Sequence, residues 1–104
     1  MKKTLISLIA LGGALALQPA MAQDAKTLAG AKGCLACHKE DARLVGPGYN
    51  EVAAKYAGQD GAVDMLAAKI KAGGAGVWGP IPMPPNNVTD EEAKLLAEWV
   101  LSHK

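Results

Sequence analysis

Cys34-Leu35-Ala36-Cys37-His38 decides how this chain folds, because the stretch has the pattern C-x-x-C-H. In a helix, Cys34 and Cys37 lie on one face, about one turn apart. Each sulfur can then form a thioether to one of two neighbouring vinyl groups on a porphyrin edge, and His38 can point its imidazole at the iron. The stretch therefore predicts covalent attachment of one haem c, with His38 as an axial ligand to the iron.

Other uses of the two cysteines fit the sequence less well. A disulfide within the motif would close a strained loop that is easily reduced. A thioredoxin-like redox pair requires a βαβ setting, and a zinc site requires four ligands. The chain has 2 Cys and 2 His, and the second histidine, His103, is next to the last residue. A haem-free thiol or metal-binding module stays as an alternative, and it would be colourless.

The first 22 residues have the features of a secretory signal peptide. Lys2 and Lys3 form a basic start, residues 4–17 are mostly apolar, and Ala20-Met21-Ala22 is a small-x-small cleavage pattern. We expect cleavage after Ala22, which leaves residues 23–104 as one small, soluble domain. An uncleaved anchor is the alternative, but the apolar run is short for a bilayer. Export agrees with the motif, because an attached haem keeps the thiols from pairing in an oxidising compartment.

The composition of the domain predicts a thin core and a nearly neutral surface. The chain has no Phe, so a large planar ring would fill space that side chains leave open. Of 11 Lys and Arg, two lie in the signal peptide, which leaves nine against 10 Asp and Glu. No basic stripe with interleaved aromatic residues indicates nucleic-acid binding.

The hydrophobic spacing predicts an all-α fold of four to five short helices. Asp24 can cap the first helix, which runs to about Lys32 with Leu28 and Ala31 facing inward. The attachment motif follows as another turn, and a second helix runs over residues 49–56. No segment alternates with period two for long enough to predict a strand.

Two further helices are predicted in the second half of the domain. Asp60 can cap a helix that ends at Gly73-Gly74. Its inward positions are Val63, Leu66, Ala67 and Ile70. Thr89 and Glu92 form a capping box that opens the last helix, which runs to about Ser102. The inward positions of this helix are Ala93, Leu96, Ala97 and Val100.

Met83 is the best candidate for a second axial ligand, since an electron-transfer haem is often held by a Met thioether. It lies in Gly79-Pro80-Ile81-Pro82-Met83-Pro84-Pro85-Asn86, where the prolines fix φ and prevent a helix or a strand. A stiff loop holds a weak, neutral ligand in place. A proline-rich linker is the alternative use of this segment. Met65 is expected to fill the core, and His103 to lie at an exposed terminus.

The chain resembles the small bacterial class I cytochromes c of the cytochrome c551/c552 type, over essentially all of residues 23–104. The class I fold wraps its helices around one covalently attached haem. The resemblance rests on five stretches: Gly33-Cys34-Leu35-Ala36-Cys37-His38, Val45-Gly46-Pro47, Val52-Ala53-Ala54-Lys55-Tyr56-Ala57-Gly58, Gly76-Val77-Trp78-Gly79-Pro80-Ile81-Pro82-Met83-Pro84-Pro85-Asn86 and Trp99-Val100-Leu101-Ser102.

The resemblance implies roles for residues around the haem. The Pro47 carbonyl would accept the Nδ1–H of His38 and orient the ring. Asn86 would lie near the sulfur of Met83 and tune it, and Trp78 would donate its indole N–H to a haem propionate. Trp99 would pack in the core between the terminal helices. Lys69 stands where some members of the family have an Arg near a propionate, and a Lys is a point donor, not a bidentate one.

The resemblance also implies a function: a periplasmic, monomeric one-electron carrier that is not an enzyme. Its partners would be periplasmic redox proteins, namely an upstream cytochrome as donor and a nitrite reductase or terminal oxidase as acceptor. A haem enzyme or gas sensor is the alternative, but it needs an open iron face with an acid–base group nearby. The segment around Met83 offers neither a His nor an Arg for that purpose.

Overall fold

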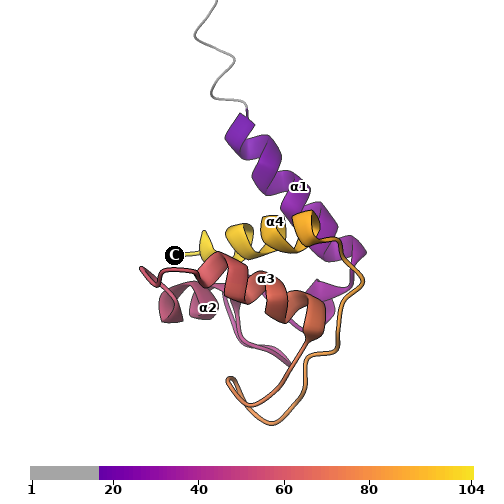
Figure 1. Cartoon of the computed structure of the whole chain (residues 1–104), viewed down its shortest axis with the longest axis vertical. Helices are drawn as coiled ribbons and strands as arrows, with labels where there is room; N and C mark the ends of the chain where they lie inside the picture. The colour runs from indigo at the N-terminus through magenta and orange to yellow at the C-terminus, as the bar shows by residue number, and fades with distance from the viewer. Residues whose placement is uncertain (1–16) are drawn as a thin grey trace, which may run out of the picture.

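The computed structural model describes the backbone of residues 17–104 and the side chains of residues 22–104. In this part of the chain it contains four α-helices and one 3-10 turn, and no strand beyond an isolated bridge between Gly74 and Met83. The elements are α1 (Leu17–Ala31), η3 (Cys34–Ala36), α2 (Tyr49–Lys55), α3 (Ala62–Ala72) and α4 (Asp90–Leu101). The predicted all-α class is confirmed (Figure 1).

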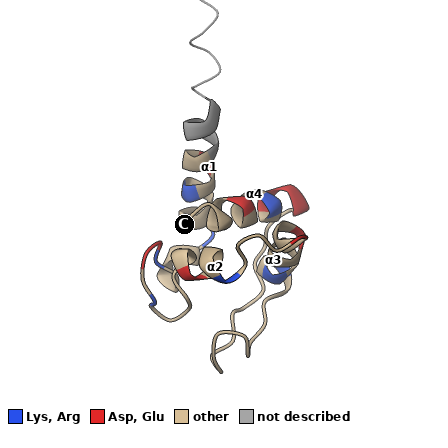
Figure 2. Cartoon of the chain, turned by 90° about the vertical axis from the view of Figure 1, so that its left-hand side faces the viewer, with Lys and Arg blue, Asp and Glu red and all other residues tan. Residues whose placement is uncertain are grey.

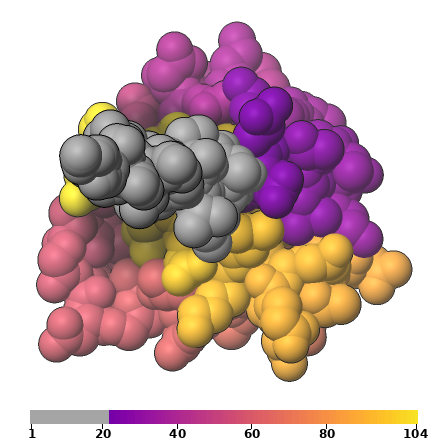
Figure 3. Space-filling model, turned by 90° about the horizontal axis from the view of Figure 1, so that it is seen from above, coloured from indigo at the N-terminus to yellow at the C-terminus, as the bar shows by residue number. Residues whose placement is uncertain are grey.

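The last helix lies at the centre of the fold. α4 packs against α1, α2 and α3. Seen from above, the C-terminal part of the chain, in yellow and orange, lies between the purple N-terminal part and the red middle part (Figure 3). Its predicted inward positions Ala93, Leu96, Ala97 and Val100 are all buried. Trp99 is also buried, as expected, and its ring meets Tyr49 edge-on at a centroid distance of 5.2 Å.

The first helix differs from the prediction at its start. It begins at Leu17, so Asp24 lies inside the helix and is not its N-cap. Residues 1–16 of the expected signal peptide lie outside the described residues, and the expected cleavage point after Ala22 falls within α1. On the inward face Ala25 and Ala29 are fully buried and Leu28 packs against them, whereas Ala31 is exposed, contrary to our expectation.

Glycines, not aspartate, bound the third helix. Gly61, with φ 78°, precedes α3, so Asp60 is not the N-cap that the sequence predicts. A glycine takes this left-handed conformation without strain and redirects the chain directly into the helix. Gly73 ends α3 as predicted, with φ 74° and its N–H donating to the Lys69 carbonyl. The inward positions Leu66, Ala67 and Ile70 pack against the core.

The capping box of the last helix is present as predicted. The Glu92 N–H donates to Thr89 Oγ1 at 3.1 Å, and the Thr89 N–H donates to Glu92 Oε1 at 2.9 Å. Together these bonds satisfy two N–H groups at the start of the helix. α4 therefore begins at a fixed point, directly after the long connection from α3.

That connection, residues 73–88, hangs away from the helices as an extended loop (Figure 1). Its first part folds back on itself, because Gly74 and Met83 exchange two backbone hydrogen bonds of 3.0 and 2.8 Å. We call residues 74–83 the hairpin. Within residues 17–104, no helix is long and apolar enough to cross a membrane.

Candidate functional site

A cavity of about 290 Å³ opens between the attachment motif, α3 and the hairpin. Most of its lining is apolar, with side chains such as Val52, Leu66, Ile70 and Leu96 on its walls. Cys34, Cys37, His38 and Met83 line the same cavity, although Met83 is far from the motif in sequence. The fold therefore brings two sulfur attachment points and two candidate iron ligands to one apolar space.

His38 has a fixed ring orientation. Its Nδ1 lies 2.8 Å from the carbonyl oxygen of Pro47. A carbonyl can only accept, so Nδ1 carries the proton and Nε2 keeps its lone pair for a metal. This is the hydrogen bond that the resemblance implies, and the buried Pro47 makes it a rigid support.

Gly46 and Tyr49 enclose the same imidazole. A Cβ added to Gly46 would lie 2.7 Å from Cε1 of His38, so only a glycine fits beside the ring. Tyr49 stacks on the ring with a centroid distance of 5.1 Å and an interplanar angle of 21°. Burial is the main reason why the pKa of the Tyr49 phenol lies above its ordinary value, and the phenol stays neutral.

The two thiols lie at the two ends of the 3-10 turn η3, because Cys34 begins the turn and Cys37 directly follows it. Gly33, with φ 78°, separates this turn from α1, and the Cys37 N–H donates to the Cys34 carbonyl at 3.2 Å. Both sulfurs are free and partly buried. Burial raises the pKa of the Cys34 thiol, because a thiolate is disfavoured away from water.

The rival ligands Met65 and His103 lie away from the cavity. Met65 is on α3 and partly buried, but it is not among the residues that line the cavity. The Nδ1 of His103 donates to the Trp99 carbonyl at 2.8 Å, and Nε2 lies 3.0 Å from a carboxylate oxygen of Glu40. Met83 is the methionine that faces the two thiols and His38.

Two cationic side chains, Lys69 and Arg43, line the cavity, and no carboxylate does. Lys69 folds over the start of the hairpin, since a Cβ added to Gly74 would lie 2.7 Å from its Nζ. The Arg43 guanidinium donates to the Trp78 carbonyl. The half-buried Trp78 also lines the cavity. Cations at the cavity could pair electrostatically with the two propionate carboxylates of a haem.

Asn86 supports the hairpin from its far end. Its Nδ2 donates to the carbonyl oxygens of Ile70 at 2.8 Å and of Pro84 at 3.3 Å. Two backbone carbonyls therefore accept from the Asn86 amide. Asn86 lines the cavity and joins the end of the loop to the end of α3.

A polar junction lies behind the His38 side of the site. Glu40 accepts from His103 and lies 3.0 Å from the ammonium of Lys26 on α1. These two partners hold the pKa of the Glu40 carboxyl below its ordinary value. The junction links α1, the segment after the motif and the end of α4. Within the described residues, no cluster of three or more His, Cys, Asp or Glu side chains could hold a metal ion.

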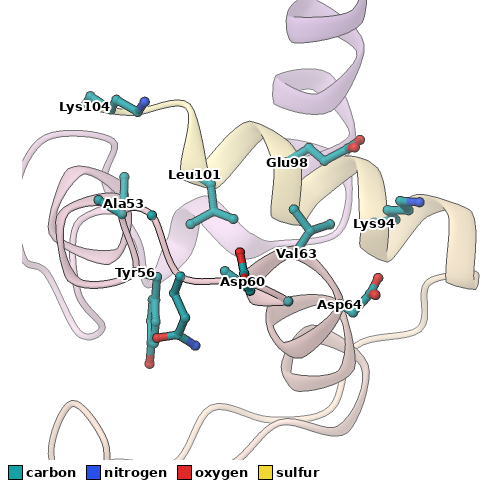
Figure 4. A pocket seen from close by; sticks show the side chains of 14 residues that line it. Ala53, Tyr56, Asp60, Val63, Asp64, Lys94, Glu98, Leu101 and Lys104 are labelled. Atoms are coloured by element: carbon teal, nitrogen blue, oxygen red, sulfur yellow. The ribbon is translucent and has the colours of Figure 1, made fainter.

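A second hollow lies between the α2–α3 connection and α4 (Figure 4). It is lined by both acidic and basic side chains, among them Asp60, Asp64, Lys94 and Glu98. Its lining contains no sulfur and no imidazole. This hollow therefore offers neither a thiol for haem attachment nor an imidazole or thioether ligand, and these groups meet in the cavity beside the motif.

The sequence matches the Cytochrome c family over residues 22–104. The chain belongs to the cytochrome c family. It is 65% identical to cytochrome c-551 of Stutzerimonas stutzeri over 104 residues, which is all of both chains. It is also 65% identical to cytochrome c-552 of Hydrogenobacter thermophilus over 77 residues, 74% of this chain and 79% of that protein.

A solved structure has the same class I cytochrome c fold. The crystal structure of wild-type cytochrome c552 of Nitrosomonas europaea superposes with a TM-score of 0.74 and 52% identity, over 76% of this chain and 99% of that one. The predicted fold and the resemblance to the c551/c552 type are thereby confirmed. This cytochrome is a small bacterial electron carrier with one covalent haem c, and Cys34 and Cys37 fit the attachment motif.

The residues at the site fit such a group. The cavity presents two thiols, an imidazole with a free Nε2, a thioether and two cations, in surroundings that are otherwise mostly apolar. Our sequence analysis missed three contributors: Gly46 and Tyr49 beside the imidazole, and Arg43 at the hairpin. The sequence offered a signal for Gly46, because it directly precedes Pro47. It offered none for Tyr49 and Arg43, because their contacts form only when the chain folds.

Proposed function

We propose that this cytochrome carries one electron at a time in the periplasm, with His38 and Met83 as the two axial ligands of its haem iron. The observation that carries the proposal is the shared cavity of His38, Met83, Cys34 and Cys37, from which the rivals Met65 and His103 are excluded. When bound, the haem supplies an iron that cycles between the ferrous and the ferric state. The two cysteines would hold it through thioethers.

His38 would keep the same position in both oxidation states. The Pro47 carbonyl fixes the ring through Nδ1, and Gly46 and Tyr49 close in on the ring itself. A hydrogen bond from Nδ1 also raises the basicity of Nε2. A ligand that does not move costs little rearrangement, and this favours rapid electron transfer.

Met83, at the base of the hairpin, would be the second ligand of the iron. Its backbone pairs with Gly74, and Pro82 and Pro84 on either side restrict φ. A thioether is a neutral ligand, and together with apolar surroundings it favours the ferrous state and raises the reduction potential. Lys69, Trp78 and Asn86 line the cavity, where they would contact the propionates or support the Met83 segment.

Redox partners would meet the protein on an apolar rim beside the cavity. The rim consists of the exposed side chains Leu35, Leu44, Val45, Val77 and Ile81, and the last three also line the cavity. Redox encounters have small interfaces and are brief. Because the rim is uncharged and the domain is nearly neutral, the encounter rate should depend only weakly on salt.

The wider setting follows from the expected signal peptide and from the family. Residues 1–22 would direct export and be removed, and residues 23–104 would work as a monomeric carrier in the periplasm. An upstream cytochrome would donate the electron, and a nitrite reductase or terminal oxidase would accept it. This carrier would not be an enzyme: the one guanidinium at the cavity, that of Arg43, is bonded to the Trp78 carbonyl.

The test is Met83→Ala, compared with Met65→Ala as a matched control. In the haem-loaded ferric protein, Met83→Ala should remove the weak far-red sulfur-to-iron band and lower the reduction potential, while the haem stays attached. Met65→Ala should keep both the band and the potential. An unchanged spectrum in Met83→Ala would overturn the ligation, and intact mass of the exported protein would check attachment and cleavage after Ala22.

A further inference from the structure

The tip of the hairpin, residues 75–82, depends on very few contacts for its position. Its only internal hydrogen bond runs from the Gly76 N–H to the Gly79 carbonyl at 2.9 Å. Among the hydrogen bonds of residues 17–104, a single one joins the tip to another segment: the Arg43 guanidinium donates to the Trp78 carbonyl. Arg43 thereby connects the segment after the attachment motif to the segment that carries Met83.

A second cation supports the same tryptophan from another element. The Lys55 ammonium, at the end of α2, lies 5.7 Å from the centroid of the Trp78 ring. At this distance an ammonium is attracted to the face of an indole. Trp78 is therefore held through its carbonyl by one cation and through its ring by another.

Trp78 is the large apolar side chain by which the tip packs against the core. The hairpin contains no charged residue, as its uniform tan colour in Figure 2 shows. Its side chains Val77 and Ile81 line the cavity and lie outside the helical core. Val77 is 52% exposed and Ile81 is 65% exposed. The Arg43 bond to the Trp78 carbonyl therefore fixes the residue through which the tip is anchored to the helices.

The two arms of the hairpin differ in stiffness. On the first arm Gly74 and Gly76 adopt φ values of 147° and 103°, and Gly79 at the turn adopts 136°, values that are accessible mainly to glycine. On the second arm the prolines fix φ up to and beyond Met83. A tip that comes free can therefore turn about the glycine arm, and the stiff second arm would carry that movement to Met83.

We propose that Arg43 is a positioning residue that latches the hairpin and so determines how readily Met83 leaves the iron. Lys55 assists it through the ring of Trp78. The inference rests on the Met83 ligation given under Proposed function. With the latch in place the thioether stays bound and small nitrogen ligands are kept out. Without it the tip opens more often, and such ligands enter faster.

The test uses imidazole as the entering ligand and the haem-loaded ferric protein. Arg43→Met keeps the length of the side chain and removes its donors. The rate of imidazole binding at saturating ligand, which reports release of Met83, should rise roughly five- to tenfold, as expected for loss of a charge-assisted hydrogen bond. Amide hydrogen exchange at Gly76 should accelerate in the same variant, while the midpoint of guanidinium unfolding changes little.

Lys39→Met is the matched control. Lys39 is an exposed cation in the same segment as Arg43, and no side-chain hydrogen bond joins it to the hairpin in the described structure. This variant removes the same charge and should leave both rates unchanged. Arg43→Lys, which keeps one donor group, should restore part of the slow binding.

The possible outcomes distinguish a failure of the Arg43 latch from a failure of the proposed Met83 ligation. Equal imidazole rates and equal Gly76 exchange in Arg43→Met and Lys39→Met would overturn the latch. If Arg43→Met does not fold, Arg43→Gln, whose shorter side chain cannot reach Trp78, carries the same expectation and the same refutation. If the wild type binds imidazole as fast as Met83→Ala, the ligation fails instead, and Gly76 exchange alone then decides whether Arg43 holds the tip.

Discussion

The segment that carries His38 and the segment that carries Met83 line one cavity, yet they are held in different ways. His38 has three supports from close by in the sequence: the Pro47 carbonyl, the backbone of Gly46 and the ring of Tyr49. The hairpin has paired backbone at its base and one side-chain bond at its tip. The comparison teaches that one proposed iron ligand is built into the scaffold, whereas the other proposed ligand is carried by a loop with fewer supports.

The origin of this difference is chain geometry. The attachment motif and Pro47 lie within a few residues of each other, so their contacts form at a small entropy cost. Met83 must be brought back to the motif across α2 and α3, and the loop that does so contains too many glycines and prolines to pair regularly. We therefore expect damage on the His38 side to unfold the protein, and damage on the Met83 side to free the loop.

The largest expected effect comes from Gly46→Ala. The new Cβ would lie 2.7 Å from Cε1 and 3.1 Å from Nδ1 of a ring that cannot move aside. Overpacking of this kind should lower the free energy of unfolding by about 2–3 kcal/mol. Guanidinium unfolding of the haem-loaded protein, followed by far-ultraviolet circular dichroism, measures it.

Gly30→Ala is the control for that experiment. A Cβ at Gly30, inside α1, would have Leu35 Cδ1 as its nearest neighbour at 3.9 Å, which is ordinary contact. This variant should be as stable as the wild type or slightly more so. Equal loss in both variants would mean that the ring of His38 has room to shift and is not fixed by Gly46.

A smaller loss of stability is expected from Gly73→Ala, at the base of the loop. The added Cβ would lie 2.9 Å from backbone atoms of Pro84 and Pro85, and the position has φ 74°. Because the loop can move away, the loss should stay at about 2 kcal/mol, and the far-red band expected from Met83 ligation should weaken. Unfolding curves and the ferric spectrum together measure both effects.

Gly58→Ala is the control for Gly73→Ala, because it shows the effect of backbone strain without a steric clash. Gly58 has the same φ of 74°, but no atom lies within 4 Å of its added Cβ. This variant should cost about 1 kcal/mol for the conformation alone and keep the far-red band. Loss of the band in both variants would show that the Met83 segment responds to any loss of stability.

The smallest effect should appear in the pH dependence of Asp90→Asn. Lys71, at the end of α3, holds the pKa of the exposed Asp90 carboxyl below its ordinary value. A depressed pKa stabilises the folded state above the ordinary carboxyl pKa, and this contribution is lost as the pH falls through the folded value. Asp90→Asn should therefore flatten the fall of the melting temperature in acidic solution below the ordinary carboxyl pKa.

Glu91→Gln is the comparison for this ion pair. Glu91 lies in the same first turn of α4, and no ion pair connects it to another described residue. Both substitutions remove a negative charge near the helix N-terminus, where it is favourable. If the two variants give the same pH profile, the helix terminus explains the effect and Lys71 does not contribute.

Local rules predicted the parts of this fold that short stretches determine. The capping box of Thr89 and Glu92 formed as expected, and so did the stop of α3 at Gly73. Asp24 and Asp60 were wrong as caps because each had a competitor: the helix continued upstream of Asp24, and Gly61 made the turn into α3. An aspartate near an expected helix start therefore does not by itself determine where the helix begins.

The site was predictable where the reactive groups are adjacent in the sequence, as in the attachment motif. The Pro47 hydrogen bond was available from the family alone. Contacts between distant segments were not available from the sequence, because spacing does not say which side chains meet. The stacking of Tyr49 on His38, the Arg43–Trp78 bond and the use of the Asn86 amide by Ile70 all belong to this class.

The buried alanines of the first and last helices have a consequence for the order of events during synthesis. α1 packs on α4, and Ala25, Ala29, Ala93 and Ala97 are all fully buried. This contact joins the two ends of the domain, so it cannot form until the final residues have been delivered. Cys34 and Cys37 directly follow α1, so their surroundings are complete only after α4 has packed against that helix.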